Sequence, residues 1–164
     1  MTKIGIFYGS STGVTAEVAK EIAKTLNVAD ADVHDVAKSK PSDLGNYDIL
    51  VLGSSTWGDG DIEHEWYDFL DGAKALDLKG KKIAIFGCGD ETMADTFCNA
   101  VGILYKEMKK TGAEMIAPFD AVGYNFNHSE AALGNHTYAG LMLDQVNHPQ
   151  LTPGRIAEWV KEIK

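Results

Sequence analysis

The chain has 164 residues, of which 45% are hydrophobic, and its formal net charge is −9. This length and apolar content predict one domain, residues 1–164, built around its own hydrophobic core. The negative charge argues against nucleic acid or an anionic membrane as a partner and favours proteins with basic docking surfaces. The sequence shows neither a signal peptide nor the roughly 20-residue apolar run that crosses a bilayer, which predicts a cytoplasmic protein without membrane contact.

Short apolar runs alternate with helical patterns along the chain. Strands are predicted at residues 3–8, 32–36, 48–53, 82–87 and 114–117. Helices are predicted at residues 18–26, 66–73, 97–108 and 156–163, where apolar residues recur at helical spacing. Most of the strand runs are apolar without alternation, which is typical of parallel strands covered on both faces. The pattern therefore predicts an α/β three-layer sandwich with a five-stranded parallel sheet in the order 2-1-3-4-5.

One segment, at about residues 120–140, is too long for an ordinary connection and is expected to be an insertion. Ligands of such sheets bind beyond the carboxyl ends of the strands, where the strand order reverses. Residues 9–15, 54–60 and 88–93 leave the central strands at that edge. We therefore expect the functional site to lie among these three segments.

The first of these segments has the composition of a phosphate-binding turn. It is Gly9-Ser10-Ser11-Thr12-Gly13-Val14-Thr15, and it contains no Lys or Arg. Backbone N–H groups at the start of a helix, together with hydroxyl groups, can bind a phosphate without a basic side chain. The Walker A lysine and the GxGxxG pattern are both absent, which favours a phosphate monoester over a nucleoside triphosphate or NAD. The alternative is a serine-rich turn in which Thr12 only caps the helix.

This segment resembles the phosphate loop of flavodoxins, and the resemblance extends along the whole chain. Residues 55–60, Ser-Thr-Trp-Gly-Asp-Gly, are similar to the second flavin loop of that family. Residues 86–90, Phe-Gly-Cys-Gly-Asp, are similar to the start of the third. The insertion falls where long-chain flavodoxins interrupt the fifth strand, and residues 140–144 followed by Asn147 resemble the stretch that closes it. The resemblance implies a flavodoxin-like fold, non-covalently bound FMN and one-electron transfer at low potential.

The resemblance also implies which residues bind FMN. They are Ser10, Ser11, Thr12, Gly13, Val14, Thr15, Ser55, Thr56, Trp57, Gly58, Asp59, Gly60, Cys88, Gly89, Asp90, Met93 and Asp144. Residues 10–15 would hold the phosphate, and Trp57 would cover one face of the flavin ring. Residues 58–60 would face flavin N5, and residues 88–90 would line the pyrimidine end. Asp144 would contact the flavin loops from the closing segment of the insertion.

Two of these residues carry more specific hypotheses. Met93 lies about where the family supplies a Tyr that stacks on the outer face of the flavin. Because Met gives less stacking area and rigidity, we expect weaker FMN binding than a Tyr would provide. The Gly58 carbonyl is expected to turn toward N5 when one-electron reduction adds a proton there, because Gly tolerates the required backbone change.

Acidic residues are concentrated in the segment that follows the second loop. They are Asp59, Asp61, Glu63, Glu65, Asp68 and Asp71, and no Lys or Arg lies among them. Negative charge near the flavin would lower its potential and attract basic partners. For Asp68 and Asp71 alone, a solvated helix face is the alternative interpretation. The histidines show no metal-ligand spacing and are expected at the surface, and both cysteines are expected to be free thiols.

The resulting hypothesis is a monomeric FMN electron carrier that shuttles electrons between a flavodoxin reductase or similar donor and acceptor oxidoreductases. It would have no substrate turnover of its own and no metal. The alternative is an FMN-dependent quinone reductase on the same fold, although no NAD(P)H-binding segment is evident. A phosphorylated receiver domain is excluded because Gly9-Ser10 stands where its acidic pair would follow the first strand.

Overall fold

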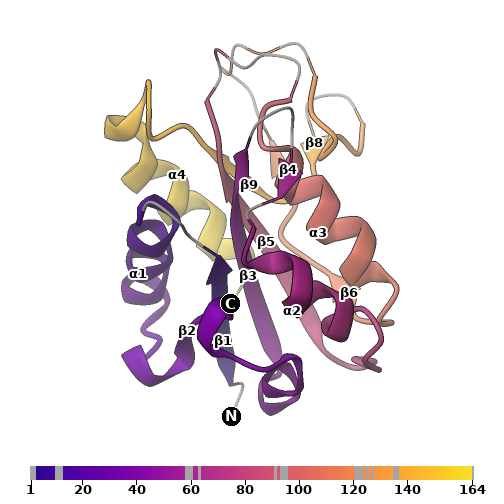
Figure 1. Cartoon of the computed structure of the whole chain (residues 1–164). Coiled ribbons are helices and arrows are strands. Elements are labelled where there is room, and N and C mark those ends of the chain that lie inside the picture. The colour runs from indigo at the N-terminus through magenta and orange to yellow at the C-terminus, as the bar shows by residue number, and fades with distance from the viewer. Residues whose placement is uncertain are drawn as a thin grey trace.

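The computed structural model describes residues 3–9, 13–57, 61–62, 64–90, 92, 96–120, 124, 126, 128–134 and 137–163. In the first half of the chain the elements are β1 (Ile4–Gly9), α1 (Val14–Leu26), β2 (Val33–Asp35), β3 (Ile49–Trp57), β4 (Asp61–Ile62) and α2 (Trp66–Ala73) (Figure 1). The second half contains β5 (Lys82–Cys88), α3 (Asn99–Lys109), β6 (Glu114–Met115), β7 (Phe119–Asp120), β8 (Thr137–Tyr138), β9 (Leu141–Leu143) and α4 (Thr152–Trp159). Short 3₁₀ segments lie at Asp30–Asp32, Val36–Lys38, Pro41–Asn46, Pro149–Leu151 and Val160–Glu162.

The main sheet has the predicted parallel order, which is β2-β1-β3-β5-β6 in these labels. In register, Ile6 of β1 lies between Val33 of β2 and Val51 of β3, and Val51 in turn lies beside Ala84 of β5. The order therefore reverses next to β1, because β2 and β3 extend the sheet in opposite directions from it. The predicted fold class is confirmed.

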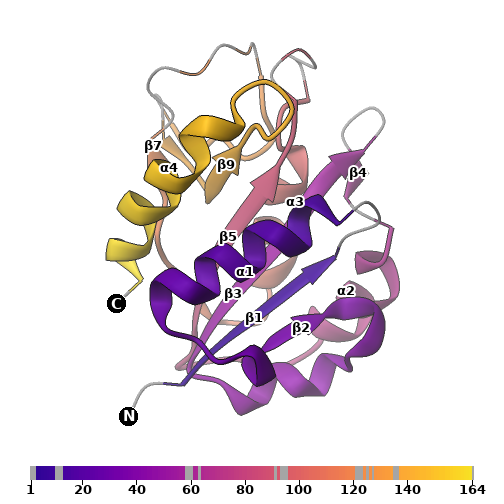
Figure 2. The same cartoon turned by 90° about the vertical axis from the view of Figure 1, so that its left-hand side faces the viewer.

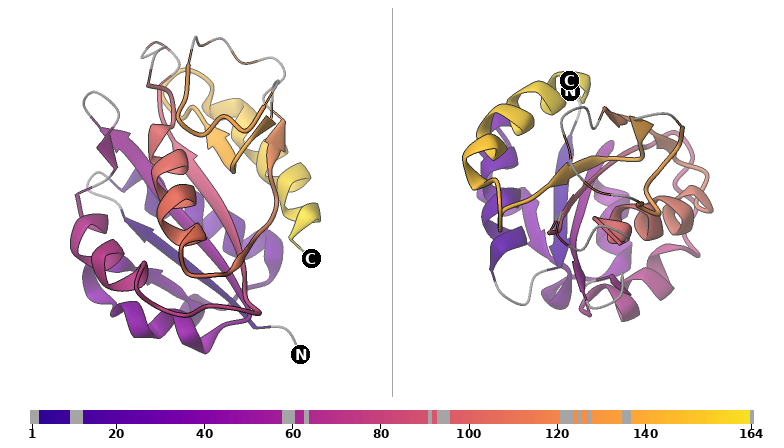
Figure 3. Two further views of the ribbon diagram at one scale, coloured as in Figure 1. Left: turned by 90° about the vertical axis from the view of Figure 1, so that its right-hand side faces the viewer. Right: turned by 90° about the horizontal axis from the view of Figure 1, so that it is seen from above.

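Helices cover both faces of the sheet. α1 and α4 lie on one face (Figure 2), and α2 and α3 lie on the other (Figure 3). Neighbouring residues of a strand point to opposite faces, so Phe7 packs with the α2 and α3 side chains whereas Ile6 packs with those of α1 and α4. Each face also buries a tryptophan whose indole is satisfied: Trp66 Nε1 donates to the Gly53 carbonyl, and Trp159 Nε1 to that of Ala117, both at 2.8 Å.

The fifth strand is interrupted, as predicted. β6 pairs with the start of β5, and β9 pairs with its end at Phe86–Cys88, both in parallel. Ala117 has a φ of 56°, a left-handed conformation that turns the chain away from the sheet soon after β6. The chain returns at β9 after the small antiparallel pair β7–β8.

The half of the sheet that contains β1, β2 and β3 has two further features. Between β2 and β3 the described residues form 3₁₀ segments and no α-helix. The expectation of surface histidines is wrong for His34, which is half-buried and stacks on Phe7 with ring centroids 4.7 Å apart. Its Nε2 lies 2.7 Å from the Tyr47 hydroxyl, which donates to Asp32 at 3.0 Å. No helix among the described residues is long and apolar enough to cross a membrane.

Candidate cofactor site

Loops from four strands converge at the carboxyl edge of the sheet around a cavity of about 160 Å³. Its lining residues are Val14, Ser55, Thr56, Cys88, Gly89, Asp90, Gln145 and Val146. The first six belong to the predicted site. They lie at the start of α1, at the end of β3, and at or directly after the end of β5. The structure therefore brings together residues that are far apart in the sequence, at the edge where open α/β sheets bind ligands.

The first loop ends at the start of α1, where Gly13 and Thr15 have features that suit an anion. Gly13 has a φ of 91° and precedes α1, and its carbonyl accepts the Glu17 N–H at 3.1 Å. Thr15 is only 1% exposed, yet its Oγ1 makes no hydrogen bond of standard geometry with the described residues. A buried hydroxyl without a partner is costly unless a ligand completes it. Ser10, Ser11 and Thr12 lie outside the described residues.

The second loop leaves the sheet at the end of β3. Ser55 lies beside Cys88 in the β3–β5 register, and the Ser54 hydroxyl donates to the Ser55 carbonyl at 2.9 Å. Thr56 Oγ1 accepts the backbone N–H of Ala100 at 3.0 Å, which ties this strand end to the start of α3. The backbone of Trp57 pairs with that of Asp61 in β4, but the Trp57 side chain and residues Gly58, Asp59 and Gly60 lie outside the description.

The third loop begins at Cys88, which ends β5. Burial, followed by the nearby charge of Asp144, raises the pKa of the Cys88 thiol to about 12, although its interaction with Thr15 acts in the opposite direction. The thiol is therefore neutral at physiological pH and offers the cavity an uncharged wall. Gly89 donates its N–H to Leu143 at 2.9 Å. A Cβ at Gly89 would come within 3.0 Å of the Cys98 backbone nitrogen, so this close approach favours glycine.

Asp90 and Asp144 are joined through Asn147. The side-chain amide of Asn147 donates to one carboxylate oxygen of each aspartate at 2.8 Å. Asp144 is fully buried and also accepts the backbone N–H groups of Val146 at 3.0 Å and Asn147 at 2.8 Å. Hydrogen bonds from Thr92, and then from Asn147, hold the pKa of the Asp90 carboxyl below its ordinary value. This network fixes the segment after β9 against the third loop.

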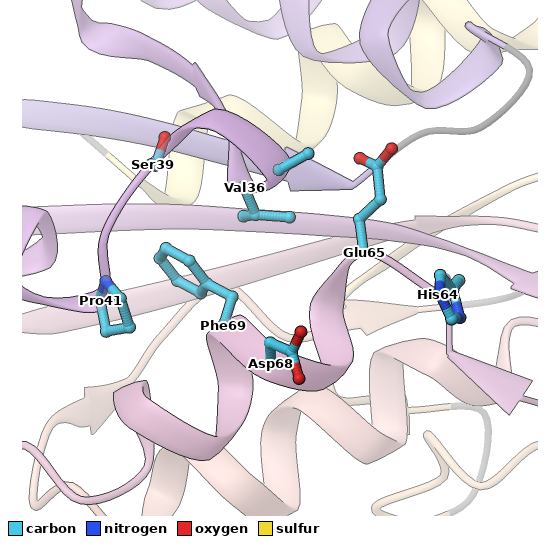
Figure 4. A pocket seen from close by; sticks show the side chains of 8 residues that line it. Val36, Ser39, Pro41, His64, Glu65, Asp68 and Phe69 are labelled. Carbon is cyan, nitrogen blue, oxygen red and sulfur yellow. The ribbon is translucent and has the colours of Figure 1, made fainter.

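A second hollow, of about 370 Å³, lies where the end of β2 faces the start of α2 (Figure 4). Its lining residues are Val36, Ala37, Ser39, Pro41, His64, Glu65, Asp68 and Phe69. Burial, and then the charges of Asp35 and Glu65, raise the pKa of Tyr8 at the end of β1. Two carboxylates, those of Asp35 and Glu65, therefore act on Tyr8 at the edge of the sheet next to the first loop. Asp71, by contrast, is exposed and pairs with Lys74 at 3.3 Å.

Sequence reasoning missed two residues of the cavity, Gln145 and Val146, although it singled out the stretch that contains them. Val146 is 69% exposed, so its side chain lies at the mouth of the cavity. An exposed valine and a glutamine carry no motif, and only the pairing of β9 with β5 brings them here. Met93 lies outside the described residues. Both cysteines are free, as expected.

The described residues fit a flavin mononucleotide. A buried hydroxyl at a helix start, without a hydrogen bond of standard geometry among the described residues, suits a phosphate. The largely apolar cavity between the second and third loops suits a ring system. No group of His, Cys, Asp and Glu among the described residues could hold a metal ion.

Comparison with known proteins agrees with this geometry. The flavodoxin family model matches residues 6–159. Flavodoxin 1 of Shigella flexneri is 43% identical over 160 residues, covering 97% of this chain and 91% of that protein. Flavodoxin 1 of Escherichia coli K12 is 42% identical over 164 residues, covering 99% and 93%.

Solved structures agree as well. Fusobacterium nucleatum flavodoxin bound to flavin mononucleotide has a TM-score of 0.89 and 29% identity, covering 99% of this chain and 97% of that one. Oxidised flavodoxin 2 from Bacillus cereus has a TM-score of 0.74 and 29% identity, covering 97% and 95%. Neither comparison favours a quinone reductase. The chain belongs to the flavodoxin family, and it is an FMN-dependent electron carrier rather than an enzyme with a substrate of its own.

Proposed function

We propose that this flavodoxin works at low potential, taking single electrons from a reductase and passing them to acceptor oxidoreductases. Bound FMN supplies the one-electron chemistry, and the protein supplies binding, orientation and electrostatics. The observation that carries the proposal is the buried Thr15 hydroxyl at the helix start beside the loop cavity. Among the described residues it makes no hydrogen bond of standard geometry.

Residues 10–15 hold the phosphate in this proposal. Thr15 donates its hydroxyl, and Gly13 gives the backbone the left-handed turn that starts α1. The positive end of the α1 dipole takes the place of a basic side chain. Ser10, Ser11 and Thr12 add the remaining donors.

The ring lies between the second and third loops. Among the described residues, the ring is surrounded by Val14, Ser55, Thr56 and residues 88–90. Asp144 acts indirectly, because Asn147 bonds to both Asp144 and Asp90 and so fixes Asp90. Trp57 and Met93 cover the two faces, and residues 58–60 face N5 and provide the Gly58 carbonyl.

Low potential follows from the charge around this edge. Asp35 and Glu65 already disfavour deprotonation of Tyr8 at the end of β1. The same carboxylates would disfavour added negative charge on the cofactor, because like charges repel more strongly where water is partly excluded.

The acidic edge also defines the partner class, which is redox proteins with basic docking surfaces. We propose that residues 1–164 act as one domain and as a monomer in the cytoplasm, so that this edge stays open to successive partners. Sedimentation of the FMN-loaded protein checks the oligomeric state, and a dimer that buries the cavity would contradict it.

The proposal is tested first by the spectrum of the purified protein. It should be yellow, and the colourless apoprotein should recover the colour with one equivalent of FMN. Failure to take up FMN would overturn the proposal. Steady-state oxidation of NADH by a quinone without a partner reductase would favour the quinone reductase instead.

Docking is tested by the rate of electron transfer to a basic acceptor such as cytochrome c. The rate should fall as salt rises, and Asp68→Asn should slow it at low salt. Asp71→Asn is the matched control, because Asp71 is already paired with Lys74. Equal effects of the two changes would place docking elsewhere.

A further inference from the structure

A hollow of about 410 Å³ lies between the insertion and α4, where β7 approaches that helix (Figure 2). Its lining residues are Phe119, Asp120, Tyr124, Leu151, Gly154, Arg155 and Glu158. None of them lines the cofactor cavity. The electron-carrier function therefore does not explain the hollow beside α4.

The hollow contains a cation whose hydrogen bonding is incomplete. The guanidinium carbon of Arg155 lies 4.0 Å from the centroid of the Tyr124 ring. Its Nη1 is buried and has no hydrogen-bond partner among the described residues. A cation over an aromatic face is stabilised, but the ring offers no acceptor for the N–H groups. A buried donor of this kind indicates a missing acceptor.

The Tyr124 ring that faces Arg155 is held in place by other parts of the protein. The Tyr124 hydroxyl donates to the Met142 carbonyl of β9, which anchors the far side of the ring. Phe119 meets Tyr124 edge-on, with ring centroids 5.6 Å apart. Leu151, which is 43% exposed, stands among the lining residues as an apolar side chain open to solvent.

We propose that this hollow binds a small organic monocarboxylate with an apolar or aromatic body. A planar carboxylate matches the fork of guanidinium N–H groups. The lining contains one guanidinium and two carboxylates, those of Asp120 and Glu158, so a dianion such as phosphate would meet more repulsion than a monoanion. Phe119, Tyr124 and Leu151 would take up the apolar body.

Phenylacetate is the probe, titrated into the full FMN-loaded chain while amide resonances are followed by NMR. We expect saturable shifts at Leu151, Gly154 and Arg155 and no change in the visible spectrum of the flavin. Phenylethanol, which has the same ring without charge, and inorganic phosphate should each bind more weakly. Equal binding of phenylethanol or phosphate, or no saturable shifts with phenylacetate, would overturn the proposal.

Two pairs of variants locate the site. Arg155→Met should weaken phenylacetate binding about tenfold or more, and Arg155→Lys should weaken it less because the charge is kept. Leu151→Glu places a like charge at an exposed position where folding is not at risk, and it should abolish binding that Leu151→Gln retains. Unchanged affinity in Leu151→Glu would refute the site even if the Arg155 variants were unstable. Because the readout does not depend on the flavin, failure here leaves the electron-carrier function intact.

Discussion

The two ends of the cofactor site differ in how their buried polar groups are satisfied. At the β5–β9 end, Asp144 accepts two backbone N–H groups and the Asn147 side chain, which also reaches Asp90. At the β1–α1 end, the equally buried Thr15 hydroxyl makes no hydrogen bond of standard geometry with the described residues, although it interacts with the Cys88 thiol. The first end is complete in the protein alone, and we propose that the FMN phosphate completes the second. We therefore expect mutations at the first end to affect folding and those at the second to affect FMN binding.

The largest effect should come from Asp144→Ala. This change leaves the N–H groups of Val146 and Asn147 and one Asn147 amide donor without their acceptor in a buried site. We expect the free energy of unfolding to fall by about 3 kcal/mol in both the apoprotein and the FMN-loaded protein. Urea denaturation monitored by circular dichroism measures it.

Asp71→Ala is the control for loss of an acidic side chain. Asp71 is exposed and forms a surface ion pair with Lys74, so its removal should cost about 0.5 kcal/mol or less. Similar losses in the two variants would mean that the Asp144 network does not stabilise the fold.

Thr15→Val should have the next largest effect, and on binding rather than folding. Removing a hydroxyl that donates to a phosphate should weaken FMN binding about tenfold to hundredfold. The apoprotein should keep its stability, because valine has the same shape and leaves no unpaired buried oxygen. Quenching of flavin fluorescence measures the affinity, and urea denaturation of the apoprotein measures the stability.

Thr15→Ser keeps the hydroxyl and should retain most of the affinity. If Thr15→Val bound FMN as tightly as the wild type but unfolded more easily, Thr15 would belong with Asp144 as a structural residue. The distinction between the two ends of the site would then be lost.

Features set by local sequence could be predicted, whereas contacts between distant segments could not. The strands and helices follow from local periodicity, so residues such as Val18 and Ile22 of α1 are buried as their spacing indicates. The convergence of three loops follows from parallel topology alone. The Asp90–Asn147 bond joins residues 57 positions apart, and no pattern within either segment specifies it.

Residues whose surroundings come from distant segments of the chain were the hardest to predict. His34 is half-buried because Phe7 and Tyr47 provide a ring to stack on and a hydroxyl to bond, and both come from other strands or turns. Gln145 and Val146 reach the cavity only because the insertion returns the chain to the end of β5. The surroundings of these residues depend on which strands pair in the folded protein, and the periodicity of one sequence does not reveal that pairing.

Alkaline pH offers a third way to separate the two ends, through the Cys88 thiol that lies between Thr15 and Asp144. Its pKa is raised from 9.0 to about 12 in the folded protein, so the unfolded chain loses this proton first as pH rises. Stability should therefore fall between about pH 9 and pH 12, by at most about 1.4 kcal/mol per pH unit for this group. Cys88→Ala should make that fall shallower.

Tyr47 also contributes to the alkaline loss of stability, so Cys88→Ala should remove only part of that loss. Burial, followed by its hydrogen bond to Asp32, raises the Tyr47 pKa to about 12, so Cys88→Ala should retain the Tyr47 part of the alkaline loss. Urea denaturation at several pH values compares the two slopes. Identical slopes in the wild type and Cys88→Ala would show that the thiol titrates as it does in the unfolded chain.

The smallest expected effect concerns Asp90 at the completed end. Its pKa lies below the ordinary 3.8 mainly because of the Thr92 hydroxyl and backbone N–H, with Asn147 a lesser contributor. Asn147→Ala should therefore raise the Asp90 pKa only slightly and leave it below the ordinary value, because the larger Thr92 contributions remain. NMR titration of the Asp90 carboxyl carbon measures this directly.

Because the folded pKa is depressed, the stability that Asp90 contributes is present above about pH 4 and is lost as pH falls through the folded pKa. The alanine variant should lose less stability over that acid range than the wild type, since part of the depression has already been removed. An Asp90 pKa that does not move would mean that Asn147 serves Asp144 alone. Among the described residues, the third loop would then be held by its own Thr92 turn and by the hydrogen bond from the Gly89 N–H to the Leu143 carbonyl.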